Sequence, residues 1–297
     1  AVGHTSLHLN TTGASNVAVG KGALDANTTA SDNTAVGAAA LGANTTGAAN
    51  VAVGTNALLT AVTAEANVAV GKDALKLNTA SNNTALGAAT MPANTSGAFN
   101  TAVGTSALLA NTTGATNVAV GSSALDANTT GSGNVGLGVN ALGTNTTAAN
   151  NTAVGHEALK LNTTGANNTA VGTQTLDANT TANDNTAIGS GALTSNTTGA
   201  GNTAVGRLAL DSNTTGAGNQ AFGKDSLAAN TTGSLNSAYG AGALQANTTA
   251  SNNTSVGYLS LAANTTGSEN VAVGQGALTA NTTAANNTAV GASSLLV

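Results

Sequence analysis

Residues 18–34 read AVGKGALDANTTASDNT, and residues 35–51 read AVGAAALGANTTGAANV. The two stretches have the same length and carry Ala-Val-Gly, Ala-Leu, Asn-Thr-Thr and Asn at the same places. The pattern recurs throughout the 297 residues, in units that start at Ala1, Ala18, Ala35 and onward. A fixed short period of this kind is typical of a solenoid, in which each repeat stacks on its neighbours.

One unit is shorter than the others. Eighteen unit starts can be counted, and each spacing is 17 residues except that between Ala69 and Ala85, which is 16. The residue missing from unit 69–84 falls at Asn-Thr-Ala-Ser, residues 78–81. A deletion within a strand would turn its side chains to the other face, so we expect this one to lie in a turn. The sequence predicts a single repeat array over 1–297, and we expect it to be a fragment of a longer chain.

The composition differs from that of an ordinary globular domain. Charged residues make up 6% and aromatic residues 1%, there is no cysteine, and the net charge is −5. A typical soluble domain has about 25% charged residues. The many Val and Thr residues and the low charge argue against disorder. Without a basic stripe or a long apolar run, we expect no nucleic-acid partner and no membrane insertion in this segment.

We number each unit from the alanine of Ala-Val-Gly as position 1. Positions 16, 17, 1 and 2 predict a short strand, which the glycine at position 3 ends, as at Gly20, Gly37 and Gly54. Positions 6–9, for example 23–26, predict a second short strand, and Asn-Thr-Thr-Gly predicts a turn. The expected fold is all-β: a parallel β-solenoid, or β-roll, of about 18 coils with two short strands per coil.

The repeat also predicts which side chains lie inside. We expect interior ladders of valine at position 2 and leucine at position 7, namely Val19, Val36, Val53 and Leu24, Leu41, Leu58. Asparagines in register can hydrogen-bond to one another between coils. Two such ladders are expected, at position 16 with Asn16, Asn33, Asn50 and Asn67, and at position 10 with Asn10, Asn27 and Asn44.

Position 1 is expected to point outward, opposite to position 2, yet it is always small. One explanation is that Ala18, Ala35 and Ala52 form a face against identical chains, because a strand that is apolar on both sides is usually buried on both. The other is that a narrow coil admits only small residues at this position. Phe222 and Tyr239, which replace valine at position 2, challenge the assignment of position 2 to the interior.

Residues 33–37, Asn-Thr-Ala-Val-Gly, and 185–189, Asn-Thr-Ala-Ile-Gly, carry a resemblance. They resemble the YadA-like (Hep/Hag) head repeats of trimeric autotransporter adhesins. Similar arrays occur in long bacterial surface proteins and phage tail-fibre-like proteins. The resemblance covers the whole chain and implies a left-handed parallel β-roll, a homotrimer, and an adhesive or spacer role. The family's usual unit is somewhat shorter, and the Asn-Thr-Thr-Gly turn differs from it.

We expect no catalytic, cofactor-binding or metal-binding residues. His4 and His8 share one coil and are the best metal candidates, but exposed surface histidines are the better interpretation. Glu65, Glu157 and Glu269 lie in separate coils, so no acid–base pair is indicated. The sparse aspartates do not match a calcium-binding nonapeptide repeat.

The sequence thus predicts an extracellular, cell-surface fibre segment, either a rod-like spacer or an adhesin head. Its expected partners are itself, as a homotrimer or filament, and a host or environmental surface. Two alternatives are an ice-binding or other surface-binding solenoid, suggested by the paired threonines at positions 11 and 12, and a phage tail-fibre shaft. An enzyme built on a β-helix needs a charged groove, which the composition disfavours.

Overall fold

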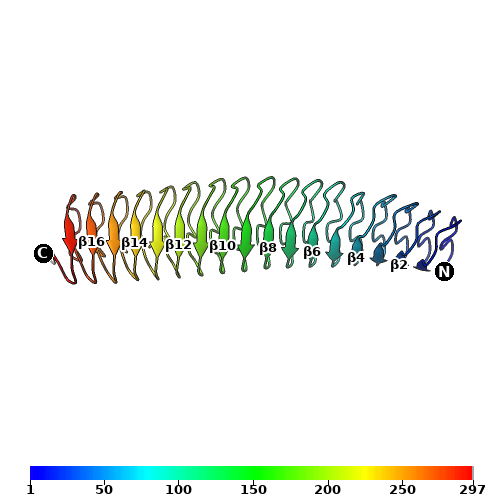
Figure 1. Ribbon diagram of the computed structural model, residues 1–297, viewed down its shortest axis with the longest axis horizontal. Coiled ribbons are helices and arrows are strands. Elements are labelled where there is room, and N and C mark those ends of the chain that lie inside the picture. The colour runs from blue at the N-terminus through cyan, green and yellow to red at the C-terminus, as the bar shows by residue number, and fades with distance from the viewer. Residues whose placement is uncertain (296–297) are drawn as a thin grey trace. The chain divides into compact units, whose positions relative to one another are not determined.

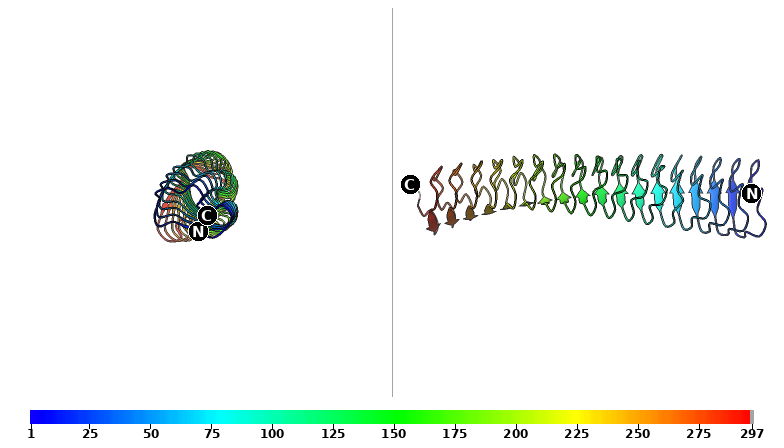
Figure 2. Two further views of the ribbon diagram at one scale, coloured as in Figure 1. Left: turned by 90° about the vertical axis from the view of Figure 1, so that its right-hand side faces the viewer. Right: turned by 90° about the horizontal axis from the view of Figure 1, so that it is seen from above.

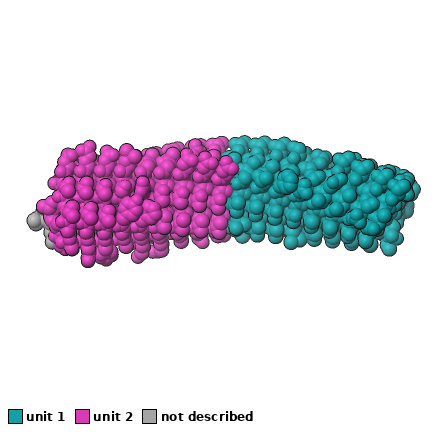
Figure 3. Space-filling model, viewed as in Figure 1, with its two compact units in different colours: residues 1–149 teal, residues 150–297 magenta. Residues whose placement is uncertain are grey.

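The computed structural model describes residues 1–295. They fall into two compact units, residues 1–149 and the described part of 150–297, which Figure 3 distinguishes by colour. Each unit is a stack of coils, and one three-residue strand recurs in each coil (Figure 1). The prediction of a parallel β-solenoid of about 17 residues per coil is confirmed within each unit.

The strands are numbered in chain order. Unit 1 contains β1 (Val17–Val19), β2 (Thr34–Val36), β3 (Val51–Val53), β4 (Val68–Val70), β5 (Thr84–Leu86), β6 (Thr101–Val103), β7 (Val118–Val120) and β8 (Val135–Leu137). Unit 2 contains β9 (Thr152–Val154), β10 (Thr169–Val171), β11 (Thr186–Ile188), β12 (Thr203–Val205), β13 (Gln220–Phe222), β14 (Ser237–Tyr239), β15 (Thr254–Val256), β16 (Val271–Val273) and β17 (Thr288–Val290). Over residues 1–295 the backbone forms no α-helix, and none of it is a helix suited to crossing a membrane.

Neighbouring strands within a unit pair in parallel and in register, as Ala18 does with Ala35. The short unit keeps this register, because Ala69 pairs with Ala85 and Val70 pairs with Leu86. The missing residue therefore lies outside the strand, as the sequence predicts.

The predicted second strand at positions 6–9 is wrong, and each coil has a single strand. The backbone there is wound rather than extended, because Gly22 at position 5 has φ +68° and Leu24 at position 7 has φ +50°. Hydrogen bonds between coils persist nonetheless: the amide of Leu24 donates to the carbonyl of Ala40 at 3.0 Å. Figure 2 shows this part of each coil as a loop without an arrow.

The two faces of the strand are the reverse of the prediction. The position-1 alanines Ala18, Ala35 and Ala52, expected on an inter-chain face, are at most 1% exposed and lie inside the coil of their own chain. The position-2 valines expected inside point outward: Val19 and Val36 are 39% and 36% exposed, and Val53 is half-buried. The predicted leucine ladder is confirmed, since Leu24, Leu41 and Leu58 are fully buried.

The interior is too narrow for valine beside the strand. At Gly136, which replaces the position-1 alanine in β8, an added Cβ would lie 3.4 Å from Cγ of Leu125 and 3.2 Å from the carbonyl oxygen of Ala141. Leucine at position 7 and alanine at position 6 thus already fill the space opposite the strand. Position 1 therefore admits only small side chains, the largest being Ser255, which settles the two explanations in favour of the narrow coil.

Both asparagine ladders form, and they meet at one carbonyl group. At position 10 the side-chain amide of Asn44 donates to Oδ1 of Asn27 at 3.0 Å and to the carbonyl of Gly47 at 3.0 Å. At position 16 the side-chain amide of Asn33 donates to the same Gly47 carbonyl at 2.9 Å, and Asn33 Oδ1 accepts the backbone N–H of Asn50 at 2.9 Å. Asn16 and Asn67 make ladder bonds of the same kind at position 16. The ladders therefore satisfy turn groups that are shielded from water.

Position 3 requires glycine for two reasons: its backbone conformation and the close approach of the next coil. Gly20, Gly37 and Gly54 have φ between +129° and +138°, a region that is essentially restricted to glycine. A Cβ at Gly37 would lie 2.6 Å from the carbonyl carbon and oxygen of Gly54 in the next coil. The recurring glycine thus ends the strand and lets successive coils approach closely.

Candidate interaction face

The first and third residues of every strand, positions 17 and 2, project from the outer side of the strands. We call this set of side chains the sheet face and describe it within each unit separately. Its residues are mostly threonine or valine at position 17 and valine at position 2. They range from half-buried to exposed, whereas the residue between them is buried in every strand.

No residue of the sheet face in β1–β17 is charged. The charged side chains lie at other positions of the coil, for example Lys21 and Arg207 at position 4, Asp73 at position 5 and Asp177 at position 8. Uncharged β-branched residues repeat at the spacing of strands in a sheet, about 4.8 Å. Each unit therefore presents a regular, weakly polar strip that is suited to contact with another surface.

Two coils in unit 2 depart from this pattern in both columns of the face. β13 has Gln220 and Phe222, and β14 has Ser237 and Tyr239. The rings of Phe222 and Tyr239 stack, with centroids 5.0 Å apart and planes within 6°. The hydroxyl of Tyr239 donates to Oε1 of Gln220 at 2.5 Å. The position-2 aromatics are thus accommodated because position 2 points outward.

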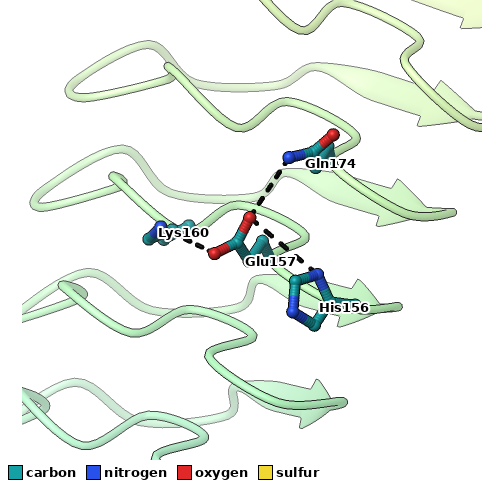
Figure 4. A network of polar contacts seen from close by, with 4 residues as sticks. All are labelled: His156, Glu157, Lys160 and Gln174. Carbon is teal, nitrogen blue, oxygen red and sulfur yellow. Dashed lines mark hydrogen bonds and ion pairs between the residues drawn. The ribbon is translucent and has the colours of Figure 1, made fainter.

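A polar network lies on the part of the coil formed by positions 4–8, which we call the wound side (Figure 4). The carboxylate of Glu157 accepts hydrogen bonds from Lys160 Nζ at 2.7 Å and from Gln174 Nε2 at 3.2 Å, and His156 Nδ1 lies 3.9 Å away. The hydrogen bond from Lys160 is the main reason that the pKa of Glu157 is lowered. A carboxylate held ionised in this way suits an ion pair within its coil and a hydrogen bond from the next coil better than it suits a general acid.

Unit 1 contains a similar arrangement. Asp73 accepts a hydrogen bond from Asn56 Nδ2 at 3.0 Å, and Lys76 Nζ lies 3.6 Å from its carboxylate. The hydrogen bond from Asn56, helped by the lysines, lowers the pKa of Asp73. In both units a position-5 acid is therefore tied to a position-8 lysine and to an amide at position 5 of a neighbouring coil.

Three aspartates at position 8 have the opposite environment. Burial raises the pKa of Asp126, Asp177 and Asp211 above its usual value. The Oδ1 atom of Asp177 is buried without a hydrogen-bond partner. No two of these three aspartates lie in adjacent coils, so they do not form with one another a carboxylate pair of the kind used in acid–base catalysis.

The histidines do not converge on a metal site. His4 and His8 are exposed, and His8 Nδ1 lies 3.7 Å from Asp25 Oδ1. Within residues 1–295 the acidic, histidine and cysteine side chains form no group of three that could hold a metal ion.

The paired threonines at positions 11 and 12 do not form a flat row of free hydroxyl groups. At position 11 the hydroxyl usually donates to the next coil's backbone, as Thr11 does to the carbonyl of Thr28 at 2.9 Å. The outward threonines that lie in a regular column are instead those at position 17 of the sheet face, such as Thr169, Thr186 and Thr203.

Sequence reasoning placed the leucines and asparagines correctly in ladders, but it wrongly assigned the position-2 valines to the interior and so missed the sheet face. Val19, Val36 and Val53 belong to it, whereas Ala18, Ala35 and Ala52 do not. The signal that could have found it is the range of sizes at each position: position 1 never exceeds serine, while position 2 accommodates Leu86, Phe222 and Tyr239.

Comparison with known proteins adds no functional assignment. No protein-family model matches the chain, and no curated protein matches it either.

Proposed function

We propose that this chain is a structural and adhesive fibre segment that works outside the cell and associates with copies of itself through the sheet face. The observation that carries the proposal is the uncharged, regular sheet face of each unit, in a molecule whose charges all lie elsewhere on the coil. Contiguous exposed apolar surface marks interaction sites, and exposed valines such as Val19, Val36 and Val120 recur along this weakly polar face.

The resemblance to the head repeats of trimeric autotransporter adhesins supports a homotrimer with a left-handed coil. In such an assembly the sheet faces of three parallel chains would meet around a common axis. Around a threefold axis the same face of every chain turns toward the axis, so like charges on it would be brought together, and an uncharged face suits this arrangement. The wound side, with its lysines and carboxylates, would remain in contact with water and with the surface to which the fibre attaches.

Sedimentation equilibrium of the full chain tests the proposal directly. We expect a mass three times that of one chain, and a monomer at micromolar concentration would contradict self-association. The variant Val171→Glu with Val205→Glu places charges on the face and should dissociate the assembly. The matched control, Thr173→Glu, adds a charge at exposed position 4, where other coils carry lysine or arginine, and should leave the mass unchanged.

Ice binding is the second candidate, and the column of outward threonines at position 17 favours it. It competes with self-association for the same surface, because a face that copies cover cannot meet ice. A thermal-hysteresis assay on the full chain distinguishes the two. Ice binding would be favoured if the full chain is monomeric, shows thermal hysteresis, and loses that activity in the Val171→Glu, Val205→Glu variant.

A further inference from the structure

A solenoid that associates through its sheet face has a register problem, and this inference rests on the self-association proposed above. Successive coils present nearly the same two residues, valine or threonine followed by valine. If one chain slid along its neighbour by one coil, about 4.8 Å, most contacts would be replaced by equivalent ones. Most of the face therefore cannot define one alignment of the chains.

β13 and β14 differ from the other strands of unit 2, so they can distinguish one alignment of the chains from another. Valine precedes them at Val205 and follows them at Val256 in the same column, so the two rings of Phe222 and Tyr239 stand in a row of smaller side chains. In the other column Gln220 and Ser237 lie between Thr203 and Thr254. The face therefore changes in shape and in polarity over the same two coils.

We propose that Gln220, Phe222 and Tyr239 set the register in which copies of this chain associate. The partner is a second copy in parallel orientation, because only a surface with the same coil spacing stays in step with this face over many coils, and because neither surface carries charge. The rings are fixed in place by their stacking and by the hydrogen bond from Tyr239 to Gln220.

The extra bulk of the rings is the physical reason that one register is preferred. In register, the aromatic rings of all copies meet at one height, pack against one another, and every other coil brings valine against valine. Out of register by two or more coils, the rings of each copy press against the valines of its neighbour. The faces are then held apart at twice as many heights, and the aromatic contacts are lost.

Disulfide trapping in the full chain measures the register, because the chain has no cysteine of its own. Val171→Cys and Val205→Cys each place one thiol on the face of unit 2, two coils apart. Chains of the two variants, one carrying a size tag, are unfolded together, refolded and oxidised. Parallel association in register should link 171 to 171 and 205 to 205, and links between 171 and 205 should be rare.

The decisive variant adds Gln220→Thr, Phe222→Val and Tyr239→Val, which are residues that other coils carry at these positions. It should keep the oligomeric mass, while links between 171 and 205 rise by about tenfold, the change that about 1.4 kcal/mol of register preference produces. Adding Val256→Phe and Val273→Tyr to this variant, which moves the aromatic pair two coils along, should restore the single register.

The outcomes separate the two proposals. A monomeric mass with no links overturns self-association, and the register inference with it. An oligomer in which the offset links are already frequent, or in which the three substitutions leave them rare, overturns the register inference alone. In the latter case the stacked pair acts within one chain or serves a different partner.

Discussion

The side-chain oxygen Oδ1 of Asn44 is buried without a hydrogen-bond partner, where Ala61 replaces the next asparagine of the position-10 ladder. In the coil before, Asn27 Oδ1 accepts the side-chain amide of Asn44 at 3.0 Å. A buried acceptor that has lost its donor costs about 1–3 kcal/mol. The ladder is thus interrupted at one identifiable point in unit 1.

Restoring the ladder should stabilise the protein. In Ala61→Asn the new amide can donate to Asn44 Oδ1 and to the carbonyl of Ala64, as Asn44 does to the carbonyl of Gly47. We expect the free energy of unfolding to rise by about 1–3 kcal/mol, measured by urea denaturation. The matched variant Asn111→Ala removes the donor to Asn94 Oδ1, a bond of 2.8 Å, and should lower stability by a similar amount. Changes of the same sign in the two variants would contradict the ladder.

The reversal of the strand's faces leads to a second prediction. Ala35 is fully buried and Val36 is 36% exposed. Ala35→Val adds two methyl groups to a filled interior and should cost about 1–3 kcal/mol. Val36→Ala trims an outward side chain and should change the stability of the isolated chain by less than about 0.5 kcal/mol. Urea midpoints compare the two, and a larger loss from Val36→Ala would restore the original assignment.

The period, the leucine ladder, the asparagine ladders and the place of the deletion could be predicted because each follows from residues that recur at fixed spacing. The direction of the strand's side chains could not be predicted in the same way. Alternation shows only that Ala35 and Val36 lie on opposite faces, and valine was assigned inside because it is the more apolar. Leu41, from the next part of the coil, occupies the interior, and the alternation along the strand cannot reveal that this leucine already fills the space.

The prediction of a second strand was wrong for a different reason. Ala23-Leu24-Asp25-Ala26 alternates as a strand does, but Leu24 adopts a left-handed backbone that residues other than glycine rarely take. The coil as a whole sets this conformation, because the amide of Leu24 donates to the next coil's Ala40 carbonyl. A pattern of side chains does not reveal a backbone geometry that only stacking stabilises.

Glycines at two positive-φ positions should differ in how they tolerate a side chain. Gly201 at position 15 has φ +67° and no atom within 4 Å of an added Cβ, and Ala49 and Ala66 adopt similar angles at the same position of other coils. Gly201→Ala should therefore cost only about 1 kcal/mol. Gly37→Ala combines a backbone conformation restricted to glycine with overlap against Gly54 and should cost about 2–5 kcal/mol. Amide hydrogen exchange should show opening localised around the Gly37 coil, and equal protection in both variants would contradict this.

Acids at positions 5 and 8 should give opposite dependences of stability on pH. Burial raises the pKa of Asp177 in the folded chain, so the native state binds more protons than the unfolded state between the two pKa values. Stability therefore falls as the pH rises through that window, which begins near the ordinary value of 3.8 and extends upward. Asp177→Asn should be more stable than the parent at pH 7, and the difference should vanish below the ordinary pKa.

Glu157 provides the matched comparison, because the hydrogen bond from Lys160 lowers its pKa in the folded chain. Its contribution is present above the ordinary value of 4.5 and is lost as the pH falls through the lowered pKa. Glu157→Gln should thus be less stable than the parent at pH 7, and the loss should disappear in acid. The sign of the shift in urea midpoint, measured for each variant at pH 7 and in acid, checks the prediction. Two variants that shift in the same direction at pH 7 would contradict it, because they would show that burial at position 8 and pairing at position 5 do not act oppositely on their carboxylates.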